Sequence, residues 1–340
     1  MDGGRHQNIR VAYITSTREF AREEPMQQDD GTDISQNHRG SLPALIGLLS
    51  GYNRSRLETG APAIQMSLIL MDDDAPERDF SDLGVPMRIE PSSPFASIRA
   101  PRGASPIQRM EALERKANAK AGYEQRLLSV LHAHQIDVAV SDRYMRVFGD
   151  MFLLEFLGLT LNTHPARLPG LEGKTPTLDA MERAKGTGYR FHGNTFHIVD
   201  GKIDHGPPLT QEETTPIYPE RDTLAMLRRR NRERETPNIF TGLVGYLSDP
   251  QVLRLISLHR EFVHGNGGRQ AAFDRMAGLR MDIIDGYRRR FEQNLQEQRR
   301  EPCAEGTYKY SAFMEGDRLR RMRQREDIGA RPMLGSRLAR

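Results

Sequence analysis

Short apolar runs alternate with segments of helical periodicity along the first half of the chain. The runs end in polar or turn-forming residues, which is typical of buried strands. Strands are predicted at residues 10–15, 63–71, 86–89, 136–140 and 159–161. Helices are predicted between them at residues 41–49, 106–134 and 150–156. This alternation predicts an α/β fold with a mostly parallel, Rossmann-like sheet and helices on both faces.

The pattern changes after Pro169. A short helix is predicted at 177–185, and two paired strands are predicted at 189–199 and 209–215, with a turn at Asp200-Gly201. From residue 221 the period is helical. Helices are predicted at 221–235, 237–247, 250–262 and 269–297. We therefore expect one domain at 1–220, with a polar insertion at about 16–37, and an Arg-rich helical extension at 221–340 whose last residues lack a stable fold.

Charge is distributed unevenly over these two parts. The whole chain of 340 residues carries 49 Lys and Arg against 46 Asp and Glu, a net charge of +3. Residues 221–340 carry a net +9 and the first 220 residues a net −6. The densest basic run, 228–234, could bind phosphate or nucleic acid, but a solvated helix face is the favoured interpretation.

Composition excludes several classes of protein. No apolar run is long enough for a transmembrane helix, and the first residues have no signal-peptide pattern, so we expect no membrane association. Cys303 is the single cysteine, which excludes a disulfide framework and a cysteine-based zinc site. A reducing, cytoplasmic location is expected.

Polar segments follow two neighbouring strands of the predicted sheet. Residues 141–146 follow the strand at 136–140, and Asn162-Thr-His164-Pro165 follows the strand at 159–161. Ligands of open α/β sheets bind at the carboxyl ends of the strands. A further segment places Asp204 in a loop bounded by Gly and Pro. An imidazolium and an amide can stabilise an oxyanion while a carboxylate accepts a proton, so the set Asn162, His164 and Asp204 suits acyl transfer to an amine.

These segments resemble the formyltransferase family that uses 10-formyltetrahydrofolate, whose members act on glycinamide ribonucleotide, methionyl-tRNA and amino sugars. The family pattern is Asn-x-His-Pro, a Leu-Pro-x-x-x-Gly loop and a later Asp-x-Gly-Pro, with a Gly-x-Thr-Val-His strand and a Phe-Met-Arg segment. The corresponding residues here are 162–165, 168–173, 204–207, 193–197 and 144–146. The resemblance covers about residues 130–215 well and the N-terminal half weakly.

The resemblance implies a role for each matching residue. Asn162, His164 and Asp204 would be catalytic: the first two stabilise the oxyanion, and the third sets the charge of His164 and assists proton removal from the amine. The residues implied in binding the formyl donor, 10-formyltetrahydrofolate, are Tyr144, Met145, Arg146, Val147 and Asp200. The residues implied in binding the acceptor are Arg39, Gly40, Ser41 and His197, and a purely structural role for His197 is equally compatible with the sequence.

The sequence also departs from the family. In the purine enzyme the first strand leads into a Gly-Ser-Asn loop that binds phosphate at a helix N-terminus. Here an insertion precedes Gly40-Ser41 and the Asn is missing, which argues against glycinamide ribonucleotide as the acceptor. Gly173-Lys-Thr-Pro176 is more similar to the tRNA and sugar enzymes, but the helical tail differs from the β-barrel of the tRNA enzyme.

No metal site is expected from local spacing. His132 and His134 lie two residues apart near a helix end, whereas a metal-binding pair on a helix is more often four apart, so both are assigned to the surface. The acidic residues 72–74 are interpreted as an ordinary turn after a strand. Gly173-Lys-Thr is no phosphate-binding loop, because position 168, where its first Gly belongs, is Leu.

The sequence thus predicts an N-formyltransferase that moves a formyl group from 10-formyltetrahydrofolate to an amine on a small-molecule or conjugated acceptor. Two alternatives stay open: a formyltetrahydrofolate hydrolase that uses the same site with water, and a non-catalytic protein that binds RNA or another partner through its basic tail. Assembly into a homo-oligomer also stays open.

Overall fold

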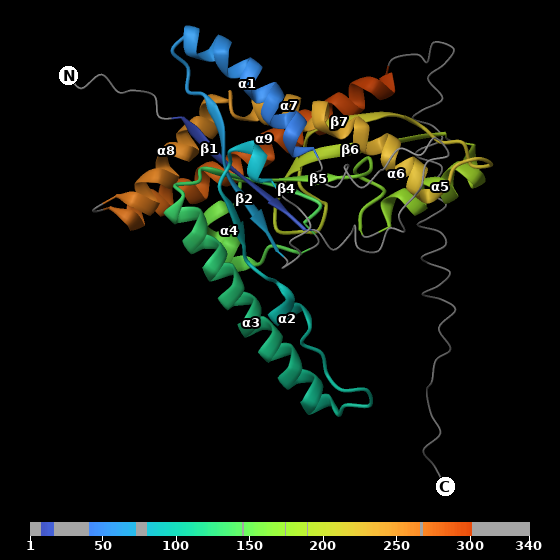
Figure 1. Cartoon of the computed structure of the whole chain (residues 1–340), viewed down its shortest axis with the longest axis horizontal. Coiled ribbons are helices and arrows are strands. Elements are labelled where there is room, and N and C mark those ends of the chain that lie inside the picture. Colours follow the sequence, from blue (N-terminus) through green and yellow to red (C-terminus); the bar gives the residue numbers. More distant parts are fainter. Residues whose placement is uncertain are drawn as a thin grey trace.

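A seven-stranded sheet forms the centre of the protein (Figure 1). The computed structural model describes residues 8–16, 41–72, 80–144, 146–173, 175–188, 190–265 and 268–300, with side chains up to 296. The strand order is β3-β2-β1-β4-β5-β6-β7. The strands are β1 (Ile9–Thr15), β2 (Ile64–Met71), β3 (Met87–Ile89), β4 (Val138–Asp142), β5 (Thr160–His164), β6 (Phe191–Ile198) and β7 (Pro208–Pro216). The first five strands pair in parallel, and β6 pairs antiparallel with both β5 and β7. The mostly parallel sheet and the pairing of β6 with β7 are as the sequence predicts, whereas the pairing of β6 with β5 is not predicted.

Helices cover both faces of this sheet. They are α1 (Leu42–Glu58), α2 (Ser93–Ala96), α3 (Pro106–Ala133), α4 (Asp150–Phe156), α5 (Pro176–Thr187), α6 (Leu224–Glu233), α7 (Glu235–Tyr246), α8 (Pro250–His264) and α9 (Arg269–Arg300). In Figure 1, α1 and α7 lie above the sheet, and α3 and α4 lie below it. The predicted α/β class, with a helical C-terminal part, is therefore confirmed.

Local sequence explains where the helices begin. The side chain of Ser105 accepts a hydrogen bond from the Gln108 N–H, and Gln108 returns one, so α3 begins with a capping box followed by Pro106. Helix α1 is longer than the predicted 41–49, because its polar second half still packs Arg56 against neighbouring elements. It ends at Glu58 with Thr59 as the C-cap, and Gly60 follows with a left-handed φ of 71°.

Strand β5 extends beyond its predicted end at residue 161. Asn162 and His164 are opposite His197 and Thr195 of β6 in the antiparallel register. Both side chains therefore stand on the last residues of a strand rather than in a loop. Pairing with β6 supplies the backbone hydrogen bonds that continue β5, and the apolar run by itself does not indicate this.

The C-terminal helices share the hydrophobic core of the sheet. Tyr246 of α7 donates a hydrogen bond to the Gly158 carbonyl at 2.5 Å, and Arg260 of α8 pairs with Asp137 at 2.6 Å. The division into 1–220 and 221–340 stays a prediction. Most of the insertion at 16–37 and the tail beyond residue 300 lie outside the described residues. Within the described part of the chain, no helix is long and apolar enough to cross a membrane.

Candidate active site

A cavity of about 390 Å³ opens at the carboxyl ends of β4 and β5. Its wall comprises the ends of these strands, the loop after β6 and residues of α6 and α7. Asn162, His164 and Asp204, the three residues predicted to be catalytic, all line it. The cavity lies where ligand sites of open α/β sheets are found.

His164 is nearly enclosed, with 3% of its surface exposed. Its Nε2 is 2.6 Å from the carbonyl oxygen of Leu171, and its Nδ1 is 3.4 Å from Oδ2 of Asp204. Both ring nitrogens therefore face oxygen acceptors. Only the doubly protonated imidazolium has a proton for each of them, so this arrangement favours a positively charged ring beside the Asp204 carboxylate.

The loop that carries Asp204 is tightly constrained. Asp204 adopts a left-handed φ of 52°, a conformation that Asp tolerates better than most residues. A Cβ on Gly206 would lie 1.7 Å from the carbonyl oxygen of Ile198, so only glycine fits there. The Asp204 carboxylate also accepts a hydrogen bond of 3.0 Å from the Gly173 N–H. The Asp-x-Gly-Pro loop thus packs closely on β6 at Gly206 and holds the Asp204 carboxylate beside His164.

Electrostatics keep Asp204 ionised. Burial by itself raises the pKa of this carboxyl, but the hydrogen bond and the charge of His164 outweigh burial. The Gly173 N–H acts in the same direction, and the pKa of Asp204 is lowered from its usual value as a result. A charged carboxylate next to an imidazolium can accept or return a proton during a reaction.

Asn162 is oriented by His197, which lies opposite it on β6. The Asn162 Nδ2 is 3.1 Å from His197 Nε2, and His197 Nδ1 is 3.0 Å from the Ile198 carbonyl oxygen. Burial lowers the pKa of His197 to about 4, so the ring is neutral. Its Nδ1–H donates to the carbonyl, and its Nε2 accepts from the amide. His197 thus lines the cavity and supports Asn162.

Of the residues predicted to bind the formyl donor, three line the cavity: Tyr144, Arg146 and Val147. The Tyr144 ring stacks on Phe148 with centroids 4.9 Å apart, whereas Val147 is 48% exposed. Arg146 is held by Asp72, at 3.4 Å. Met145 lies outside the described residues.

Asp200, also predicted to bind the donor, is not among the described residues that line the cavity. Its carboxylate Oδ2 lies 2.8 Å from His205 Nδ1 and 3.0 Å from Arg288 Nη2. Arg288 belongs to α9, so the C-terminal part of the chain is tied to the loop that leads to Asp204. This contact stiffens the loop, because it removes freedom from the residues just before Asp204.

Ser41, predicted to bind the acceptor, is buried behind this cavity. Its hydroxyl donates to Oε2 of Glu235 at 3.3 Å, and Arg143 lies 3.5 Å from the same oxygen. Burial and the neighbouring Asp142 carboxylate raise the pKa of Glu235 to about 7. Of the other three residues predicted to bind the acceptor, His197 lines the cavity, whereas Arg39 and Gly40 lie outside the described residues.

The sequence analysis missed the residues that the C-terminal helices contribute to the cavity. These are Arg228, Asn231 and Arg232 of α6 and Glu235 of α7. For the residues of α6, the signal in the sequence is the basic run at 228–234, for which phosphate binding is the less favoured interpretation. Glu235 follows this run and has no signal of its own. The lining residues include five cationic side chains and two carboxylates: Arg143, Arg146, Lys202, Arg228 and Arg232 against Asp204 and Glu235.

Comparison with known proteins confirms the family resemblance. Residues 90–243 match the formyl transferase family. A phosphoribosylglycinamide formyltransferase of Mycobacterium tuberculosis is 44% identical over 80 residues, which is 24% of this chain and 35% of that protein. The enzyme of the same name from Bacillus subtilis is 32% identical over 129 residues, 37% of this chain and 63% of that protein. The matched part of the chain thus spans between about a third and just under two thirds of these relatives.

Solved structures of similar proteins include an N10-formyltetrahydrofolate-dependent formyltransferase of pyoverdin biosynthesis, which is 22% identical with a TM-score of 0.49. The match covers 69% of this chain and 98% of that one. A phosphoribosylglycinamide formyltransferase from Anaplasma phagocytophilum is 19% identical with a TM-score of 0.46, over 70% of this chain and 86% of that one.

Proposed function

We propose that this protein transfers a formyl group from 10-formyltetrahydrofolate to an amine. One observation carries the proposal: His164, with acceptors on both ring nitrogens, lies beside the Asp204 carboxylate in a cavity that also contains the Asn162 amide. The match of residues 90–243 to the formyl transferase family supports it. Curated relatives named phosphoribosylglycinamide formyltransferase support the same chemistry.

The cavity residues fit a folate. A volume of about 390 Å³ is within the range of small-molecule sites. Tyr144, Val147 and Phe148 offer apolar surface for a flat ring, and the loop at 199–204 borders the same space. When bound, the folate would supply a formyl group on nitrogen, an activated acyl group for transfer.

Each catalytic side chain has a distinct task in this proposal. The Asn162 amide has two N–H bonds, one of which donates to His197. The other N–H donates to the formyl oxygen and stabilises the negative charge that develops on it. The imidazolium of His164 stabilises the same charge through space. The Asp204 carboxylate accepts the proton that the attacking amine loses as its nitrogen bonds to the formyl carbon. The pair then returns this proton to the folate nitrogen as the bond between that nitrogen and the formyl carbon breaks, so charge balances.

The acceptor is proposed to carry a negatively charged group besides its amine. Arg228 and Arg232 project from α6 into the wall of the cavity, which has an excess of cationic over acidic side chains. Arginine recognises phosphate and carboxylate through paired N–H donors. The basic run of the sequence therefore contributes to a small-molecule site in this proposal.

The experiment is an assay of tetrahydrofolate release with 10-formyltetrahydrofolate and a panel of amines, half of which carry a phosphate or carboxylate. We expect release that depends on an anionic amine and that is abolished in His164→Asn. Release without any amine would favour the hydrolase. No release under any condition, together with salt-dependent RNA binding that persists in His164→Asn, would overturn catalysis in favour of a binding protein.

A further inference from the structure

Two histidines and a glutamate meet at the edge of the sheet opposite the candidate active site. His132 lies in the last turn of α3, Glu155 in α4 and His259 in α8. Helices α3 and α4 end just before β4 and β5 begin, so the cluster lies at the amino ends of these strands. The candidate active site lies at their carboxyl ends. The three residues span 128 positions of the sequence, from His132 to His259, and they share no local motif.

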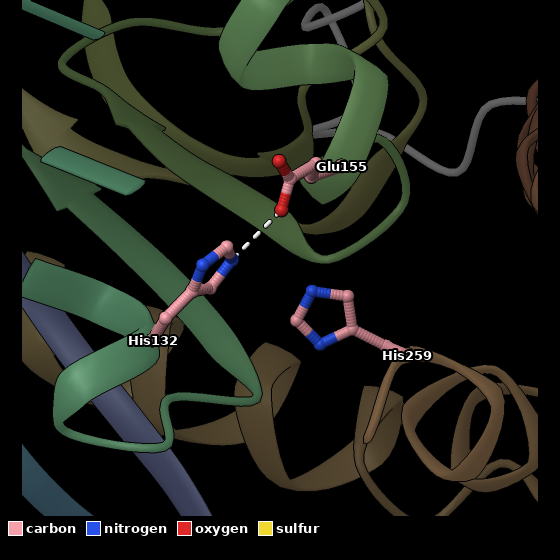
Figure 2. Close-up of side chains that lie close together, drawn as sticks. All are labelled: His132, Glu155 and His259. Carbon is pink, nitrogen blue, oxygen red and sulfur yellow. Dashed lines mark ion pairs between the residues drawn. The ribbon is translucent and has the colours of Figure 1, made fainter. Parts of the chain in front are cut away.

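The side chains converge on one point. Figure 2 shows both imidazole rings and the carboxylate directed toward a common centre. One ligand atom of each residue lies within 4.8 Å of the other two. His132 Nε2 and Glu155 Oε2 are 2.7 Å apart. Nitrogen ligands of zinc lie at roughly 2.0–2.1 Å from the ion, so small rotations of these side chains bring all three atoms into its coordination sphere.

One of the converging atoms has no partner in the protein. His259 Nε2 is buried with no hydrogen-bond partner, whereas His132 Nε2 and Glu155 Oε2 contact each other as an ion pair that lacks hydrogen-bond geometry. His259 is 2% exposed, and its ring packs edge-on against Phe156 at 4.7 Å between centroids. Buried polar atoms in folded proteins are nearly always satisfied, so an unpartnered His259 nitrogen that faces this ion pair indicates a missing shared partner.

The chemistry of the two histidines and the glutamate indicates which class of ion this shared partner is. Two imidazoles and one carboxylate suit a borderline divalent ion such as Zn²⁺ better than a hard ion such as Mg²⁺. His259 is enclosed, and its Nε2, which has no partner in the protein, can offer a lone pair to the ion. The Arg280 guanidinium donates to the carbonyl oxygens of Leu154 and Glu155.

We propose that His132, Glu155 and His259 bind one divalent transition-metal ion, with Zn²⁺ as the first candidate. The side chains of His132 and Glu155 are 31% and 20% exposed, which admits a water molecule as the fourth ligand. The ion joins α8 to α3 and α4, and so ties the C-terminal helices to the sheet. Its task is structural, and it does not depend on the proposed formyl transfer.

The test uses the full chain after removal of metal with EDTA and dialysis. Titration calorimetry with ZnCl₂ is expected to show one ion per chain, Zn²⁺ is expected to raise the melting temperature, and MgCl₂ at the same concentration to do neither. Glu155→Gln keeps the shape of the side chain and removes its charge. We expect it to weaken Zn²⁺ binding at least tenfold, and His132→Ala to do the same.

The matched control is His264→Ala, because His264 is an exposed histidine of the same helix as His259. It is expected to bind Zn²⁺ as the unchanged protein does. Substitution of Co²⁺ adds a readout of geometry, since a tetrahedral site gives an intense visible absorption that Glu155→Gln loses. Unchanged Zn²⁺ affinity in Glu155→Gln and His132→Ala, or no stoichiometric binding at all, would overturn the proposal.

Discussion

The two edges of the sheet contain histidine–carboxylate groups that differ in how their polar atoms are satisfied. At the carboxyl edge, His164 has acceptors on both nitrogens, and the Asp204 carboxylate accepts from Gly173. At the amino edge, His259 Nε2 has no hydrogen-bond partner, and the His132–Glu155 ion pair that it faces, at 2.7 Å, lacks hydrogen-bond geometry. The first group is oriented by the protein alone, which suits a site that must be ready for substrate. The second is complete only when an ion joins it.

The largest expected effect concerns the carboxyl edge alone. Asp204→Asn keeps the size of the side chain but removes the charge that faces His164, and it should lower kcat by roughly 10²–10⁴-fold, the usual contribution of a positioned acid or base. The measurement is the rate of tetrahydrofolate release with the amine that the panel identifies. Zn²⁺ binding at the amino edge should be unchanged. Exposed Glu182→Gln on α5 is the control, and equal rates in the two variants would contradict the assignment.

The next largest effect is expected from the close backbone contact in the Asp204 loop. Gly206→Ala places a Cβ against the carbonyl oxygen of Ile198, so it should destabilise the protein by more than about 2 kcal/mol and displace Asp204. Gly278→Ala on α9 meets no atom within 4 Å and should stabilise by roughly 0.5–1 kcal/mol, as alanine does in a helix. Urea unfolding measures both. If Gly206→Ala left the free energy of unfolding unchanged, the Asp204 loop would not be constrained by this contact.

The pH dependence of stability tests the neutral state of His197. Its folded pKa is about 4, below the value near 6.5 expected in the unfolded chain. The unfolded state therefore binds more protons between these values. The stability that His197 contributes is fully present above about pH 6.5. It falls as the pH decreases toward 4, by up to about 1.4 kcal/mol per pH unit. His197→Gln should lose this part of the slope in urea unfolding at pH 7, 6 and 5.

Exposed His264→Gln serves as the control for that experiment and should keep the slope of the unchanged protein. His192 and His259 also have pKa values lowered to about 3 by burial, so some slope should remain in His197→Gln. An identical slope in His197→Gln and the unchanged protein would mean that His197 is not neutral in the fold.

The smallest expected effect concerns the acceptor. Arg232→Gln should raise KM for an anionic amine about tenfold, equivalent to about 1.4 kcal/mol, with kcat nearly constant. Arg232 lines the cavity, and the proposal assigns it to the anionic group of the acceptor rather than to the reacting atoms. Arg229 of the same helix pairs with Glu233 at 3.6 Å and does not line the cavity in the described structure. Arg229→Gln is therefore the matched control. Equal KM values in the two variants would show that Arg232 does not bind the acceptor.

Much of the carboxyl edge was predictable from sequence. Apolar runs locate the strands, and parallel strands place their ends at one edge, so Asn162 and His164 are brought near residues 141–146. The Gly and Pro around Asp204 indicate a tight loop. What the local pattern did not indicate is that β6 pairs with β5 and places His197 opposite Asn162, since the register of an antiparallel pair depends on both strands.

The sequence by itself determined the α/β alternation and the helical C-terminal part, because both follow from the periodicity of apolar residues. It also indicated Asn162, His164 and Asp204 as a set, because each stands in a short contiguous motif. Tertiary structure alone decided that α6 and α7 complete the cavity and that His132 meets Glu155 and His259. Spacing assigns His132 to the surface because it compares only neighbours along one helix. Its partners lie on two other helices, and only the packing of α8 against α3 and α4 brings the three together.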